Sequence, residues 1–143
     1  MIKSKKLTNN INKINYVFPL ILIVYLVVFL TLDYGRTSGN THWLLIWIDS
    51  FPYGDKFMHF MRSFVLSGLV ACNAYLFFNP FKSIYLILLL CLFVTSLEVS
   101  QLFIDSREFS LFDLGAELLG VLVGFFLSKL ILAFYFKRKR RDN

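Results

Sequence analysis

The sequence predicts an all-α, polytopic membrane protein with four transmembrane helices and with both termini in the cytoplasm. Three observations support this fold class: an apolar composition, four separate hydrophobic segments, and basic residues that gather on alternate flanks of those segments. Of the 143 residues, 57% are hydrophobic and only 17% are charged. A soluble domain of this length would be about 45–50% apolar, so the excess favours a membrane. The chain is short enough to form one domain, residues 1–143.

The first helix is predicted over residues 14–32, which carry no charge. About 20 helical residues are needed to cross the hydrocarbon layer of a membrane. The basic tail before it, residues 1–13, is similar to the start of a signal peptide. However, the apolar run is long, and no small-x-small cleavage site follows it before Asp33. We therefore expect an uncleaved signal-anchor helix.

Three further helices are predicted over residues 57–78, 83–104 and 111–136, followed by a basic tail at 137–143. The first two helices are separated by “HWLLIWI”, residues 42–48, which is too short to cross a membrane. Its two Trp residues are typical of a segment that lies at the membrane interface.

The distribution of basic residues predicts the orientation. Ten of the 15 basic residues lie in the two tails and at Lys82, whereas the other two loops hold only Arg36, Lys56 and Arg107. Cytoplasmic flanks are enriched in Lys and Arg, so the tails are predicted inside and the two loops outside. The net charge of +6 is then suited to anionic lipid. No nucleic-acid-binding motif accompanies the charge, so nucleic acid is not expected as a partner.

Polar side chains are predicted to meet at one depth, near the outer ends of three helices. Eight of the nine acidic residues fall in the outer half of the predicted topology. At about 1.5 Å per residue, Glu98 and Glu117 each lie on the order of 9 Å inside the outer end of their helix. Asp55, His59 and Arg62 follow at i, i+4 and i+7, which places them on one helix face.

The same regular spacing occurs on the other two helices. Glu98, Gln101 and Asp105 follow at i, i+3 and i+7. The last helix carries, at i, i+4, i+7 and i+11, the residues Asp113, Glu117, Gly120 and Gly124. Small residues at this spacing allow close helix approach in lipid, so the carboxylates of this helix are predicted to face inward.

His59 and Glu98 form the candidate general acid/base pair of this cluster. The candidate ligand-binding residues are Asp55, Lys56, Arg62, Gln101, Arg107, Asp113 and Glu117. The cations among them would meet a phosphate or carboxylate through charge-assisted hydrogen bonds. A metal held by His59, Glu98 and Glu117 is conceivable, but no H-E-x-x-H or similar motif supports it. We therefore expect neither a metal nor another cofactor.

Several motifs resemble those of the VanZ-like family of bacterial membrane proteins. They are “DKFMH” at residues 55–59, “EVSQ” at 98–101, then Arg107, Asp113 and “GAELLGVLVG” at 115–124. The resemblance implies a four-helix, multi-pass protein of the bacterial cytoplasmic membrane. The family takes its name from a gene linked to low-level teicoplanin resistance. Where that family usually has Asn, this chain has Glu117.

Three functions remain open from the sequence. In the first, the polar cluster binds, or acts on, the head group of a cell-envelope lipid or lipid-linked intermediate and thereby affects teicoplanin susceptibility. Alternatively, the protein is a non-catalytic accessory or assembly subunit whose cluster is a structural network of ion pairs. A small proton-coupled exporter is less favoured, because its carboxylate should lie near the bilayer midplane. Membrane lipids are the expected partners, and whether the protein is an enzyme is left open.

Overall fold

The computed structural model describes residues 2–39, 42–77, 83–104 and 107–141. The elements, in chain order, are α1 (Ile2–Thr37), α2 (Trp43–Asp49), α3 (Gly54–Phe77), α4 (Ser83–Ser100), a 3₁₀ turn at Gln101–Phe103, and α5 (Leu111–Arg141). All regular structure in these residues is helical, which confirms the predicted all-α class.

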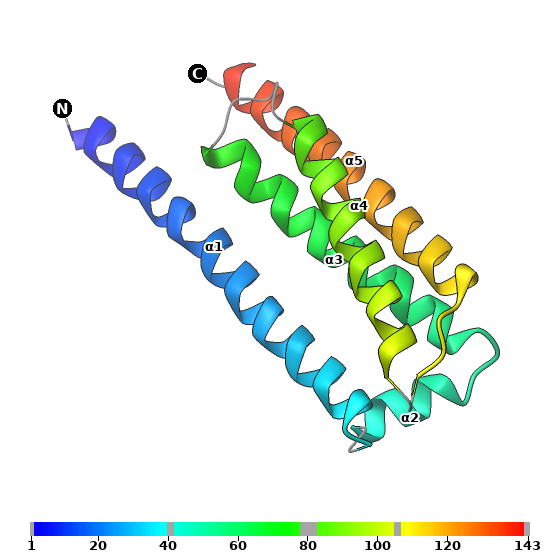
Figure 1. Ribbon diagram of the computed structural model, residues 1–143. Helices are drawn as coiled ribbons and strands as arrows, with labels where there is room; N and C mark the ends of the chain where they lie inside the picture. The colour runs from blue at the N-terminus through cyan, green and yellow to red at the C-terminus, as the bar shows by residue number, and fades with distance from the viewer. Residues whose placement is uncertain (1, 40–41, 78–82, 105–106, 142–143) are drawn as a thin grey trace.

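The helices form a bundle of α3, α4 and α5, with α1 packed along α3 (Figure 1). The N-terminal end of α1 and the C-terminal end of α5 lie at the same end of the molecule (Figure 1). The short helix α2 lies at the opposite end, where α3 and α5 begin and α4 finishes (Figure 1). We call this opposite end the α2 end.

Three helices are long and apolar enough to cross a membrane: Tyr16–Arg36, Ile84–Phe103 and Leu111–Tyr135. Helix α3 is not among them, and its first turns carry charged and polar side chains. Large apolar side chains cover the outside of the molecule; Leu88 and Phe134, for example, are each more than half exposed. Exposed apolar surface of this extent suits hydrocarbon rather than water, which indicates a membrane protein.

The helices differ in length from the sequence prediction. Helix α1 begins at Ile2 and α5 continues to Arg141, so both basic tails extend a helix. Neither tail contains Gly or Pro to interrupt the helical hydrogen bonds. Helix α4 stops at Ser100 and is followed by the 3₁₀ turn Gln101–Phe103, so the segment predicted to reach residue 104 is not one continuous α-helix. Most of the segment “HWLLIWI”, which was predicted to lie at the membrane interface, is helical as α2, with Trp43 and Trp47 exposed. Asp105 and Lys82 lie outside the described residues.

The core lies where α3, α4 and α5 meet. Its buried side chains include Leu66, Val94, Val121 and Phe125. On α5, Gly120 and Gly124 lie against the backbone of α3 so closely that a Cβ atom at either position would overlap it. The predicted close approach through this pair of glycines is therefore confirmed, and it brings the inner face of α5 onto α3.

Candidate functional site

The first two turns of α3 supply the centre of the polar cluster. Asp55, His59 and Arg62 lie along one face of this helix, as their spacing predicts. His59 is buried, with 4% of its surface exposed. Its Nε2 atom lies 3.6 Å from Oδ1 of Asp55. Its Nδ1 atom points toward the neighbouring helices.

Glu98 comes to His59 from the end of α4 and is completely buried. Its Oε2 atom lies 3.9 Å from Nδ1 of His59 and accepts a hydrogen bond of 2.7 Å from Nε2 of Gln101. Its Oε1 atom accepts a hydrogen bond of 3.2 Å from the backbone N–H of Ser110. The E-x-x-Q spacing therefore has a local role, because Gln101 orients the carboxylate of Glu98.

Glu117 comes from α5 and is also completely buried. Its Oε1 atom lies 3.0 Å from Nδ1 of His59 and forms an ion pair with the guanidinium of Arg62. Its Oε2 atom is buried and has no hydrogen-bond partner among the described residues. The nearest carboxylate to His59 is thus that of Glu117, closer than that of Glu98, its expected partner.

A second group of contacts joins α3 to the start of α5. Lys56 lies 3.0 Å from Oδ1 of Asp113 and 3.3 Å from Oδ2 of Asp55. Ser110 caps α5, since its carbonyl accepts the N–H of Leu114 and its Oγ accepts that of Asp113.

Helix α1 contributes two charged residues that the sequence did not assign to the cluster. Asp33 lies 2.9 Å from Nη1 of Arg107 and 3.5 Å from Nη1 of Arg62. Arg36 lies 2.7 Å from Asp49 and 3.1 Å from Asp55. The sequence did contain an indication of this role. Asp33 and Arg36 follow the outer end of the first predicted helix, on the same side of the predicted topology as the other polar residues.

Two aromatic residues of α1 contact Arg62. The hydroxyl of Tyr25 donates a hydrogen bond of 2.6 Å to the backbone carbonyl of Arg62. The guanidinium of Arg62 lies 4.9 Å from the ring centroid of Phe29, within cation–π distance. Arg62 is therefore fixed between α1 and α5.

All nine predicted site residues lie at the α2 end. His59, Glu98, Gln101, Arg62 and Glu117 form its buried centre. Asp55, Lys56 and Asp113 form one flank. Arg107 lies on the other flank, where its partner is Asp33.

Carboxylates outnumber cations in this cluster. The described carboxylates with ion-pair contacts here are Asp33, Asp49, Asp55, Glu98, Asp113 and Glu117. The described cations are Arg36, Lys56, Arg62 and Arg107, and each of them contacts a carboxylate. Asp49 and Asp55 are partly exposed to solvent, whereas Glu98 and Glu117 are completely buried. The negative charge that most needs a proton or a positive group is therefore that of the two buried glutamates.

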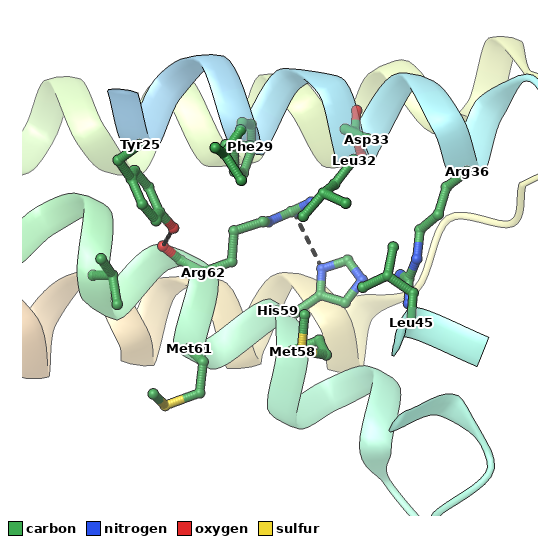
Figure 2. Close-up of a pocket in the computed structure, with 12 residues that line it drawn as sticks. Tyr25, Phe29, Leu32, Asp33, Arg36, Leu45, Met58, His59, Met61 and Arg62 are labelled. Carbon is green, nitrogen blue, oxygen red and sulfur yellow. Dashed lines mark hydrogen bonds and ion pairs between the residues drawn. The ribbon is translucent and has the colours of Figure 1, made fainter. Parts of the chain in front are cut away.

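Two cavities adjoin the cluster, and His59 lines both. The first, which we call the apolar cavity, has a volume of about 240 Å³ and lies between α1 and α3 (Figure 2). Figure 2 shows Phe29 and Leu32 of α1 opposite Arg62 and His59 of α3, with Tyr25 toward one end and Arg36 toward the other.

The second cavity, the polar cavity, has a volume of about 480 Å³. It is lined by Asp55, Lys56, His59, Gln101, Arg107, Glu108, Phe109, Ser110 and Asp113. His59 is thus the residue that the apolar cavity and the polar cavity share.

The fold and the site together define a helical membrane protein with a buried ionic cluster at one end of its bundle. In comparisons with known proteins, no family model, no curated protein and no solved structure matches the chain.

Proposed function

We propose that this chain is a VanZ-like, multi-pass protein of the bacterial cytoplasmic membrane that binds the head group of a cell-envelope lipid or lipid-linked intermediate. The observation that carries the proposal is the position of His59 between the apolar and polar cavities. An amphiphilic ligand requires both kinds of space next to each other. The start of the lipid chain would occupy the apolar cavity, and the head group would occupy the polar one.

In this proposal α3 is the fourth span and the α2 end faces outward. Helix α3 has 24 residues and is about 36 Å long, which is enough to cross the hydrocarbon layer. Its charged side chains pair with α1 and α5, so they need not face lipid. The basic residues of both chain ends support a cytoplasmic position for those ends. Labelling of a cysteine at Ser50 by an impermeant reagent, from outside intact cells, tests this orientation.

The chemistry available at the site is proton transfer. Nδ1 of His59 lies near carboxylate oxygens of both Glu98 and Glu117, so either can accept a proton from it or hold it in place. The head group would lie beside this imidazole in the polar cavity, with Gln101, Lys56, Asp55, Asp113 and Arg107 around it. A phosphate there must compete with Asp113 for Lys56 and with Asp33 for Arg107.

Mass spectrometry of co-purified lipids tests the proposal. The native protein and a His59→Ala variant are purified in parallel, with His42→Ala as the matched control because His42 is exposed. We expect one head-group class to be depleted at least tenfold in His59→Ala and unchanged in His42→Ala. The same lipid profile in all three proteins would contradict the proposal.

A second candidate function is supported by the pairing of the cations. Each described cation of the cluster contacts a carboxylate, as expected of a network that only locks α1, α3 and α5 together. In that case the protein is an accessory or assembly subunit without a ligand. A test that separates the two candidates is given at the residue scale in the Discussion.

A further inference from the structure

His59, Glu98 and Glu117 come from three different helices, yet their ligand atoms lie within 4.8 Å of one another. Nδ1 of His59 is 3.0 Å from Oε1 of Glu117 and 3.9 Å from Oε2 of Glu98. Ligand atoms of a tetrahedral zinc site with bonds of about 2.1 Å lie about 3.4 Å apart. The observed separations fall on both sides of that value, so small side-chain rotations would complete the geometry.

Oε1 of Glu117 is shared by His59 and Arg62. It lies 3.0 Å from Nδ1 of His59 and forms an ion pair with Nη2 of Arg62. Nη2 of Arg62 lies 3.3 Å from Nδ1 of His59, so both groups meet the same carboxylate oxygen. A metal ion bound by Nδ1 and by Glu117 would take the place of Arg62 at this oxygen.

Glu117 provides a second, independent indication of a missing ligand. The residue is completely buried, and its Oε2 atom has no hydrogen-bond partner among the described residues. A buried carboxylate oxygen without a donor is costly unless a proton or a cation meets it.

Metal ligands in proteins are usually held in place by hydrogen-bonding neighbours that do not touch the metal. Asp55 and Gln101 have such positions next to His59 and Glu98. Nε2 of His59 faces Oδ1 of Asp55 at 3.6 Å, as in a carboxylate–histidine–metal arrangement. Gln101 donates to Glu98 and fixes the orientation of that carboxylate. These contacts would hold the imidazole and one carboxylate in position before a metal arrives.

We propose that His59, Glu98 and Glu117 bind a divalent transition-metal ion such as Zn²⁺ or Mn²⁺. One imidazole nitrogen and two carboxylates suit these ions, and three protein ligands leave a coordination position open. The ion would supply positive charge beside two completely buried carboxylates, Glu98 and Glu117. Binding of the metal does not depend on the proposed lipid function; only its use, to meet an anionic oxygen of a head group, rests on that function.

Arg62 has to release Glu117 when the metal binds. Its guanidinium already has a second acidic neighbour, since its Nη1 lies 3.5 Å from Asp33. The metal and Arg62 therefore compete for Glu117. This competition predicts that removal of the arginine charge, in Arg62→Gln, strengthens metal binding.

The test uses the full-length protein, purified without a histidine tag and stripped with a chelator. Calorimetric titration with Zn²⁺ should show one tight site. Glu98→Gln and Glu117→Gln should each weaken it more than 100-fold, beyond the range of about 10- to 100-fold expected for an outer contact such as Gln101→Ala. Arg62→Gln should tighten it, and the exposed His42→Ala should leave it unchanged. Equal affinity in the native protein, Glu98→Gln and Glu117→Gln would overturn the proposal.

A measurement on the native protein covers the case in which a variant fails to fold. Electron spin-echo spectroscopy of bound Mn²⁺ should show coupling to one imidazole ¹⁴N nucleus, because His59 is the single nitrogen ligand of the site. Bound Mn²⁺ without such coupling, or a native protein that binds neither Mn²⁺ nor Zn²⁺, would contradict the site. Neither metal measurement involves a lipid. If the native protein and His59→Ala carry the same lipids, the proposed function is refuted, but the metal site is not.

Discussion

Glu117 determines the charge balance at the centre of the cluster. It is completely buried and contacts both His59 and Arg62, whereas an amide at this position would be neutral. Breaking a buried pair by removing one partner usually costs about 3–5 kcal/mol, because the other charge is left without compensation. Replacing both partners by apolar residues of similar volume is often close to neutral. Arg62 and Glu117 can therefore be tested as a pair.

We predict that Arg62→Met alone lowers the free energy of unfolding by about 3–5 kcal/mol, and that adding Glu117→Met recovers most of this loss. Asp33 stays compensated in both variants, because Arg107 remains 2.9 Å from it. Thermal unfolding in detergent measures the stabilities, with the exposed Arg138→Met as the control.

The double variant also separates the two candidate functions. If the cluster holds a ligand, the refolded double variant loses the head-group class seen with the native protein. If the cluster is only a structural network, the double variant keeps the native lipid profile and the native activity in cells.

At the scale of the elements, the contact between α3 and α5 positions the carboxylates. Gly120 and Gly124 let α5 approach the backbone of α3, and Glu117 lies one helical turn before Gly120. The distance from Glu117 to His59 therefore depends on how closely the two helices pack. Small residues serve this purpose in membrane helices because they present little side-chain volume.

We predict that Gly124→Leu destabilises the protein by about 1–3 kcal/mol or more, because the new side chain overlaps the backbone of Phe64. Gly115→Leu is the matched control on the same helix, since a Cβ atom there has no neighbour within 4 Å. Unfolding temperature in detergent provides the measurement. Equal destabilisation by both substitutions would show that the close approach is not required.

The spacing of residues along one helix could be predicted from the sequence, but the distances between helices could not. Asp55, His59 and Arg62 share a face because the helical repeat alone dictates it. Which carboxylate lies nearest to His59 depends on the rotation of two other helices about their axes. For this reason Glu98 was the expected partner, whereas Glu117 is closer.

The part of the site that belongs to α1 was missed for the same reason. The first helix is apolar all round, so its sequence does not indicate which face packs on α3. Asp33 and Arg36 lie on that face and pair with α3, α2 and the segment before α5. The apolar cavity follows from this packing, since Tyr25 and Phe29 form part of its wall.

At the scale of the whole molecule, the α2 end holds the polar cluster directly beside the apolar cavity. Helix α1 is largely exposed along its length and contacts α3 both beside Arg62 and farther along, where Asn73 donates a hydrogen bond to the carbonyl of Phe18. The apolar cavity lies between this helix and α3. A lipid chain could enter there from the surrounding bilayer while its head group stays beside His59.

The central claim is that one amphiphilic ligand occupies both cavities, and photo-crosslinking in membranes tests it most directly. A benzophenone amino acid is placed at Met61 in the apolar cavity, at Phe109 in the polar cavity, and at the exposed Leu130 as a control. The lipid adducts are then identified by mass spectrometry. We predict that Met61 and Phe109 capture the same head-group class, enriched over the bulk lipid captured at Leu130. If Met61 captures only bulk lipid and Phe109 captures none, the claim is wrong.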